Sequence, residues 1–336
     1  VSIPLTLTQP EETKEELEAK LFRDLLGEGT SEVSGSANRK YNVKLSAEAC
    51  NGVVLMPGEE FSYNNITGSR TADKGYRDAP TYVAGESVDN VGGGICQTSS
   101  TIYYAVLHTT LEVVERHDHQ FAVGYVPDGM DATVWYGSLD FRFKNNTNYP
   151  VKVVTESYDK NGSRFLTVKI YGTNEDGRYA VPERIQYDWI TPTTQYKADS
   201  SVPRGTTRVD SVQNAYTGLK AQTYRYIYAE DGTLLEKQDM GVSSYKMRPR
   251  TILYNPADGD PSQPASKPET PTVPETPEVP ETPTTPETPS TPETPVTPEE
   301  PQQPTQPETP VTTPEEPAQP EIPEVPETPP SQDIQA

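Results

Sequence analysis

The sequence has few cysteines, no long apolar run and fewer basic than acidic residues. Two cysteines in 336 residues are too few for a disulfide framework. No apolar run reaches about 18 residues, so no membrane span is expected. Lys and Arg number 28 against 50 Asp and Glu and form no basic stripe, so a nucleic-acid partner is not expected. Tyrosine is plentiful instead, with 20 residues, and favours strands.

Proline and charge divide the chain into two parts. Most of the 35 prolines follow Tyr254, and the tail after Lys267 has no Lys or Arg and carries about two thirds of the net charge of −22. Its Pro-Glu-Thr-Pro repeats favour polyproline II and preclude a packed core, so residues 256–336 are predicted to be a disordered spacer. The chain begins at Val1 without a signal-peptide pattern, so we expect a processed or truncated product.

The stretch Val91–Ser100 is the most informative part of the sequence. Three consecutive glycines, Gly92, Gly93 and Gly94, permit a positive φ and the close approach of a partner. They precede Cys96, which opens a predicted helix with apolar residues at helical spacing. A thiol at the N-terminus of a helix has a lowered pKa, as in the nucleophilic cysteines of papain-like enzymes. The alternative is a Gly-rich turn followed by a small, buried and inert cysteine.

The rest of the folded part predicts an α+β domain. Residues 1–35 are expected to be an N-terminal linker with a charged helix over Glu11–Leu26, stopped by Gly27 and Gly29 and forming the end of a truncated upstream region. A second helix should start at Asn38. A hairpin should precede the glycines, and candidate strands follow the Cys96 helix at 112–119, 121–126, 133–136, 139–144, 151–158 and 165–171. The last two should be joined by a hairpin turn at Asp159–Gly162. Residues 36–180 are therefore predicted to form one domain with a few helices on a largely antiparallel sheet.

The segments Gly92–Gln97, Ser99–Thr101 and Tyr103 resemble the signature of the VanW family. The similarity continues at Leu111–Arg116, His119, Tyr125–Pro127, Gly129, Asp131–Val134 and Asp140–Thr147. It covers roughly residues 38–155, and several linked motifs do not arise by accident. The family is named for its association with glycopeptide-resistance clusters in bacteria. The resemblance therefore implies a cell-envelope protein associated with peptidoglycan binding or maintenance and with vancomycin resistance.

A second unit, residues 184–255, resembles a G-five domain, a small all-β module of bacterial surface proteins. The resemblance rests on the order of Pro203–Gly205, Gly218–Lys220, Asp231-Gly232 and Arg248-Pro249. Such modules are thought to bind cell-wall aminosugars, which would make this unit a glycan binder; the alternative is a structural spacer. Three tyrosines share one strand face, which suits either stacking on sugars or sheet packing: Tyr224, Tyr226 and Tyr228.

A thiol mechanism needs a base and a group that orients the base. The sequence has three histidines, and His117 and His119 are two apart on a predicted strand, so they share a face. We predict Cys96 as nucleophile and His119 as base, with Asp131 or Asp140 orienting the imidazole. The side chain of Gln97 or the backbone N–H of Cys96 would stabilise an oxyanion. The supporting residues are Gly92, Gly93, Gly94, Gln97, Asp140 and Arg142.

Each of these residues also has a structural interpretation. Asp131 precedes Ala-Thr-Val in a turn and suits a cap there. Asp140 and Arg142 suit a cross-strand ion pair, and His119 suits a structural hydrogen bond. A further interpretation is zinc held by His117, His119, Cys96 and Asp131. No second paired-ligand motif supports zinc, so neither a metal nor another cofactor is expected.

Two functions remain open at this point. The first is a non-enzymatic protein of the cell envelope that binds peptidoglycan or another cell-wall glycan. The second is a thiol-dependent hydrolase or transpeptidase acting on cell-wall peptides. A disulfide between Cys50 and Cys96 would exclude the second. Both functions predict an extracellular location, on the cell surface or in the wall of a Gram-positive bacterium.

Overall fold

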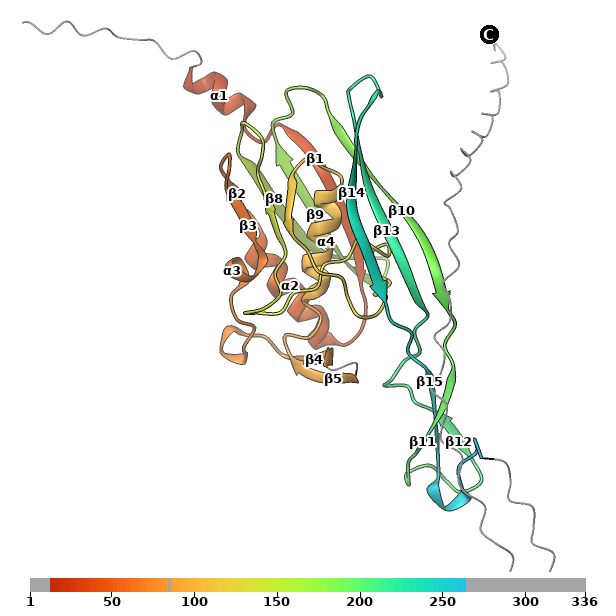
Figure 1. Cartoon of the computed structure of the whole chain (residues 1–336). Coiled ribbons are helices and arrows are strands. Elements are labelled where there is room, and N and C mark those ends of the chain that lie inside the picture. Colours follow the sequence, from red (N-terminus) through yellow and green to blue (C-terminus); the bar gives the residue numbers. More distant parts are fainter. Residues whose placement is uncertain (1–12, 84–85, 264–336) are drawn as a thin grey trace, which may run out of the picture. The chain divides into compact units, whose positions relative to one another are not determined.

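A computed structural model describes residues 13–83 and 86–263, which fall within one compact unit, Val1–Pro268 (Figure 1). Residues 1–12 of the predicted linker and nearly all of the predicted spacer lie outside the described residues. No helix in the described ranges is long and apolar enough to cross a membrane. We call residues 24–172 the first region and residues 179–254 the second region.

The first region is built on an antiparallel sheet of four strands in the order β1-β9-β8-β2. The strands are β1 (Asp24–Val33), β9 (Ser163–Gly172), β8 (Val151–Lys160) and β2 (Val54–Leu55). The predicted hairpin between the last two long strands is confirmed, with Asn161 at a φ of 53° in its turn. Together with the helices this confirms the predicted α+β class.

The start of the chain differs from the prediction. The helix expected over Glu11–Leu26 is only α1 (Lys14–Lys20), which Thr13 caps, and β1 follows it. Gly27 and Gly29 lie inside this strand and stop no helix. Glycine is needed here because a distant part of the chain packs closely on the strand: a Cβ atom on Gly27 would lie 2.5 Å from the carbonyl oxygen of Ala105. The expected linker therefore contains an edge strand of the central sheet.

Two helices pack on one face of the central sheet, α2 (Ala37–Cys50) against β8 and α4 (Cys96–Leu107) against β1 and β9 (Figure 1). Ser36, and not Asn38, caps α2. The side chains of Ser31 on β1 and Thr101 on α4 share a buried hydrogen bond of 2.8 Å. The close approach allowed by the β1 glycines thus holds α4 firmly on the sheet.

Smaller elements surround this core. A three-stranded sheet has the order β3-β7-β6, with β3 (Glu60–Ser62), β7 (Arg142–Lys144) and β6 (Glu112–Glu115). The predicted hairpin before the glycines is β4 (Asp78–Val83) and β5 (Glu86–Val91). Along the chain, α3 (Tyr63–Thr67) and η1 (Ala72–Lys74) lie between β3 and β4. The strands expected at 121–126 and 133–136 are absent from this part of the described chain, which forms loops there.

The second region consists of strands, as predicted. One sheet has the order β10-β13-β14, with β10 (Tyr179–Ile190), β13 (Gly218–Tyr228) and β14 (Leu234–Tyr245). The other pairs β11 (Thr194–Ala198) in parallel and β12 (Thr207–Val209) in antiparallel with β15 (Arg250–Tyr254), before η2 (Pro256–Asp258). The boundary expected at residue 184 falls inside β10, so the second region begins earlier.

Candidate functional site

A glycine turn sets the position of Cys96. A Cβ atom on Gly93 would lie 2.1 Å from the carbonyl oxygen of Ala79, so the backbone of β4 packs directly on the turn. Gly94 has a φ of +102°, in the left-handed region that a side chain disfavours. Helix α4 begins with Cys96 immediately afterwards. The predicted position of this cysteine at the N-terminus of a helix is confirmed.

The residue Cys96 is partly exposed, and its Sγ donates to the carbonyl oxygen of Val134 at 3.5 Å. Cys50 and Cys96 are both free, so no disulfide between them opposes thiol chemistry. Within 13–83 and 86–263, the backbone N–H of Cys96 has no hydrogen-bond acceptor, as is usual in the first turn of a helix. This N–H is available to a substrate oxygen.

His119 approaches Cys96 from a loop, because β6 ends at Glu115. Nδ1 of His119 lies 2.6 Å from Oδ2 of Asp131, and the same oxygen accepts the backbone N–H of His119 at 2.8 Å. The imidazole also lies close enough to the Cys96 thiol for each group to shift the pKa of the other. The prediction that His117 and His119 share one face of a strand is wrong, because both residues lie beyond the end of β6. His117 contacts Glu115 instead, at 3.0 Å. The structure therefore brings together the thiol, the imidazole and the carboxylate.

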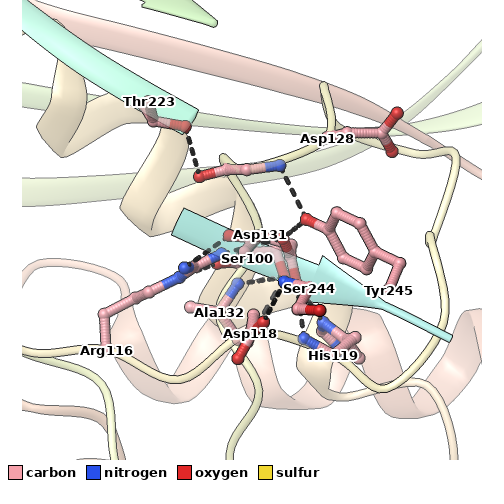
Figure 2. Close-up of polar contacts among 12 residues, drawn as sticks. Ser100, Arg116, Asp118, His119, Asp128, Asp131, Ala132, Thr223, Ser244 and Tyr245 are labelled. Atoms are coloured by element: carbon pink, nitrogen blue, oxygen red, sulfur yellow. Dashed lines mark hydrogen bonds and ion pairs between the residues drawn. The ribbon is translucent and has the colours of Figure 1, made fainter. Parts of the chain in front are cut away.

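Asp131 is fully buried and both of its carboxylate oxygens are held (Figure 2). While Oδ2 accepts from His119, Oδ1 accepts from Nη2 of Arg116 at 2.9 Å and from the hydroxyl of Tyr245. Nε of Arg116 donates to the backbone oxygen of Asp131 at 2.6 Å. These contacts prevent the carboxylate from rotating away from the imidazole, so its role exceeds that of a turn cap.

The end of β14 holds the loop that carries His119. Besides the Tyr245 contact, Arg116 donates to Oγ of Ser243 at 2.8 Å, and the backbone N–H of Ser244 donates to Asp118 at 2.7 Å (Figure 2). The backbone N–H of Lys246 donates to the carbonyl oxygen of Gln120 at 2.7 Å. The second region thus completes a site whose reactive groups all come from the first.

The contacts shift the pKa values in the direction of an ion pair. Burial alone would raise the pKa of the Cys96 thiol, but the hydrogen bond and charge of His119 outweigh burial and lower it. Burial would likewise lower the pKa of His119, whereas its bonds to Asp131 and Cys96 raise it to about 9. Despite burial, His119 and Arg116 hold the pKa of Asp131 well below its usual range. These shifts favour a thiolate beside an imidazolium.

The supporting residues have other contacts. The amide nitrogen of Gln97 donates to Ser31 and to the carbonyl oxygen of Glu32 at 2.8 Å, so this buried side chain ties α4 to β1. Asp140 accepts from Ser62 and caps α3 through the backbone N–H of Asn64. The expected ion pair between Asp140 and Arg142 is not formed, because Arg142 pairs with Glu60 instead.

Zinc finds no support in the arrangement of these side chains. Among the described residues, no three His, Cys, Asp or Glu side chains are grouped as metal ligands. The lone pairs of Asp131 are occupied by Arg116, Tyr245 and His119. The donor set therefore suits proton transfer better than metal binding.

Sequence reasoning missed several residues of the site. Arg116 was part of the family motif, but its partner lies 15 residues later. Ser100 links the carbonyl oxygen of Cys96 to the backbone N–H of Ala132, at 2.7 and 3.0 Å. The family motifs contain Arg116 and Ser100, so these two could have been found. Tyr245 lies 114 residues from Asp131, in the other region, and no local pattern signals it.

The three tyrosines of β13 alternate with residues that face the first region. Thr223 and Arg225 are buried, and Arg225 donates to the carbonyl oxygens of Thr109 and Leu111 at 3.1 and 2.8 Å. The tyrosines lie on the opposite face and are partly exposed: Tyr224, Tyr226 and Tyr228. The prediction that the three tyrosines share one strand face is therefore confirmed. On this face Lys237 lies over Tyr224, and Tyr179 stacks on Tyr228.

These observations describe an α+β domain in which a cysteine at the N-terminus of a helix lies near a histidine that is held by a buried aspartate. The family model described as VanW like protein matches residues 38–171. The chain therefore contains a VanW-like domain over these residues, as predicted from its motifs, and this domain contains Cys96, His119 and Asp131.

Two curated relatives are similar to the chain. YoaR of Bacillus subtilis (strain 168) is 45% identical over 135 residues, covering 40% of this chain and 44% of the relative. The vancomycin B-type resistance protein VanW of Enterococcus faecalis (strain ATCC 700802 / V583) is 33% identical over 116 residues, covering 33% of this chain and 42% of the relative. The chain thus spans less than half the length of each.

Two solved structures similar to the chain are G5 domains. The G5 domain of an IgA1 protease has 17% sequence identity and a TM-score of 0.17, covering 24% of this chain and 93% of the domain. The G5 domain of HP0197 has 14% identity and a TM-score of 0.14, covering 23% of this chain and 97% of the domain.

Proposed function

We propose that the VanW-like domain is a thiol-dependent enzyme that cleaves or transfers amide bonds of cell-wall peptides. The observation that carries the proposal is the relay from the Cys96 thiol through His119 to the buried Asp131 carboxylate at the start of α4. An activated cysteine needs a lowered pKa, a base and an orienting group, and all three are present. The catalytic residues are Cys96, His119 and Asp131.

The contacts define a role for each group. The Cys96 thiolate attacks the carbonyl carbon of the amide, and the backbone N–H of Cys96 donates to the oxyanion. The His119 imidazolium gives its proton to the leaving amine, so the C–N bond breaks and a thioester remains. His119 then takes a proton from water in hydrolysis, or from an amine in transpeptidation, as that nucleophile releases Cys96. Asp131 keeps the imidazole in one orientation and favours its charged form.

The cell wall is proposed as the substrate on two grounds. One relative is named for vancomycin resistance, and the matching segment includes the site. The Pro-Glu-Thr-Pro composition after Pro256 suits a spacer of a protein on the surface or in the wall of a Gram-positive bacterium. We therefore place the protein outside the cell, in the envelope.

The test is digestion of purified cell walls by the full chain, followed by separation of the released muropeptides. Wild type and Cys50→Ala should produce the same altered muropeptides, and Cys96→Ala should produce none. Cys50→Ala is the matched control, since it removes the other thiol without touching the site. Identical products from wild type and Cys96→Ala would overturn the proposal for this substrate.

A second candidate function, binding of wall glycan, is favoured by the tyrosines on the outer face of β13. Nζ of Lys237 lies 3.7 Å from the centre of the Tyr224 ring and 5.4 Å from that of Tyr226. Partly exposed tyrosine rings suit stacking against sugars, and a sugar would displace Lys237 from the ring face that it covers. The test is co-sedimentation with purified cell walls, comparing wild type with Tyr224→Ala combined with Tyr226→Ala. Deleting the second region is unsuitable, because β14 supports the His119 loop.

Unchanged sedimentation of the double variant would remove this face from the proposal. Tyr196 on β11 provides a control, as it is a partly exposed tyrosine in the other sheet of the second region. Tyr196→Ala should bind walls as the wild type does. Equal loss in this control and in the double variant would also contradict specific binding through β13.

A further inference from the structure

Arg70 is a cation with unmet hydrogen-bonding capacity. It lies in the segment between α3 and η1, and its three guanidinium nitrogens are buried. None of them has a hydrogen-bond partner among residues 13–83 and 86–263. Buried guanidinium groups are normally paired, because leaving a buried donor unsatisfied is costly, and more so when the donor is charged. The side chain therefore needs an explanation that the fold does not provide.

Two aromatic rings hold Arg70 in place. Its Cζ atom lies 5.2 Å from the centre of the Tyr63 ring and 5.8 Å from that of Tyr136. Such contacts stabilise the positive charge through the ring faces. They leave the N–H groups in the guanidinium plane without acceptors. A guanidinium held in this way is prepared for a planar, bidentate acceptor, which a carboxylate provides.

Arg70 also packs against the glycine turn that leads to the candidate nucleophile. Tyr63, which stacks on it, donates its hydroxyl to the carbonyl oxygen of Ile95, the residue before Cys96, at 3.1 Å. A Cβ atom on Gly92 would lie 2.8 Å from Cβ of Arg70, so Arg70 packs against the glycine turn. In agreement with this position, the charge of Arg70 contributes to the lowered pKa of Cys96.

Tyr136 provides a route to the buried guanidinium. Its ring contacts Arg70 on one side, while 54% of the residue remains exposed to solvent. Tyr136 comes two residues after Val134, whose carbonyl oxygen contacts the Cys96 thiol. A ring that is half exposed can move at little cost, whereas Tyr63 is fully buried. Displacement of Tyr136 would thus open Arg70 on the side of the reactive thiol.

We propose that Arg70 binds a carboxylate of the substrate next to the amide bond that Cys96 attacks. The substrate class is therefore a peptide with a free carboxylate close to the scissile amide. This inference rests on the proposed thiol chemistry and adds to it the group that selects the substrate. The carboxylate accepts two N–H bonds from Arg70, and Tyr136 moves aside when the peptide enters.

The test compares two alkylating reagents of similar size on the full chain in a Cys50→Ala background. Iodoacetate carries a carboxylate and iodoacetamide does not, so the ratio of their rate constants at Cys96 measures the preference for an anion. We expect Arg70→Gln to lower this ratio about tenfold, since one charged hydrogen-bonded pair is lost. Arg77→Gln is the matched control, because Arg77 also stacks on a tyrosine, Tyr41, at 3.7 Å. Its ratio should equal that of the starting protein.

The outcomes separate the two proposals. If Arg70→Gln slows both reagents equally, Arg70 only stabilises the thiolate, and the carboxylate proposal is overturned while the thiol chemistry stands. If neither reagent reaches Cys96 before unfolding, the proposed function fails and this inference fails with it. Should Arg70→Gln not fold, Tyr136→Ala tests the same site from its exposed side. It should raise the rate with iodoacetate severalfold more than that with iodoacetamide, and an unchanged ratio would contradict the proposal.

Discussion

The two cysteines lie at opposite ends of neighbouring helices. Cys50 is the last residue of α2, and Cys96 is the first residue of α4. Burial raises the pKa of the Cys50 thiol to about 12, whereas the pKa of Cys96 is lowered. Both contribute to the same hydrophobic core, so membership of the core does not decide the reactivity of a thiol.

The comparison identifies the cause of the difference. The charge of Arg70 acts to lower the pKa of both thiols, so Arg70 does not distinguish them. The N-terminus of a helix stabilises a thiolate and the C-terminus does not. Above all, Cys96 has an imidazole partner, and that partner is held by a buried carboxylate. Helix position and the His119 contact together separate a reactive thiol from an inert one.

The largest expected effect is the difference in labelling between the two cysteines. In the native wild-type protein at pH 7, iodoacetamide should modify Cys96 at least about a thousandfold faster than Cys50, because only Cys96 has an appreciable thiolate fraction. Mass spectrometry of the labelled peptides measures both rates. In urea the two rates should become similar. Comparable rates in the native protein would break the contrast.

Next in size is the effect of His119→Ala. Burial would then raise the pKa of the Cys96 thiol without opposition from the imidazole. The alkylation rate at pH 6 should fall about a hundredfold, because a smaller fraction of the thiol is then ionised. His117→Ala is the control, since His117 contacts Glu115, and its rate should not change. Equal rates in the His119 variant and the wild type would show that the imidazole does not activate the thiol.

A smaller effect is expected for Asp131→Asn, which keeps the shape of the side chain and removes its charge. The hydrogen bond to Asp131 helps to raise the pKa of His119 to about 9, so losing the charge should lower that value. The thiolate–imidazolium pair exists between the pKa of Cys96 and that of His119, so its upper limit should move below about pH 9. Amidase activity at pH 8 should fall about tenfold.

The absorbance of the thiolate and the muropeptide assay, both followed against pH, measure this change. Asp140→Asn is the control, because Asp140 caps α3 and does not contact the imidazole. If the upper limit stays at about pH 9 in Asp131→Asn, the carboxylate does not support the histidine.

The smallest expected effect concerns Tyr245, the contact from the second region. Tyr245→Phe leaves the ring in place but removes the hydroxyl from Asp131 and from the backbone N–H of Gly129. The free energy of unfolding should fall by about 1–2 kcal/mol, since buried polar groups lose a partner. The alkylation rate of Cys96 should fall about threefold, because the carboxylate gains freedom. Chemical denaturation and the labelling rate test these values, with Tyr226→Phe as the control on the outer face.

The elements that depend on residues close together in the sequence were predicted correctly. The glycine turn, the helix that Cys96 opens, and the two hairpins all follow from neighbouring residues. Gly27 and Gly29 were wrongly predicted to stop a helix. Glycine is needed at both positions because the backbone of α4 packs directly against them, and no local pattern shows this contact. The strand expected for His119 was wrong for a similar reason: Asp131 binds both its backbone and its ring and holds that segment as a loop.

The candidate site was predicted in part. The family motifs drew attention to Cys96, His119 and Asp131, but they did not distinguish Asp131 from Asp140, which caps a helix. That choice depends on which carboxylate is buried against Arg116 and Tyr245, and the second of these comes from another region. The unpaired nitrogens of Arg70 can be recognised only when every neighbour is placed.

The measurement that tests the central claim most directly is the pH dependence of Cys96 alkylation in the folded Cys50→Ala protein. The account predicts rapid reaction with a midpoint well below the reference of about 8.5 for a free thiol. The same profile in a His119→Ala background should have its midpoint above that reference. A single midpoint at or above about 8.5 in both proteins, or no reaction until unfolding, would contradict an activated thiol.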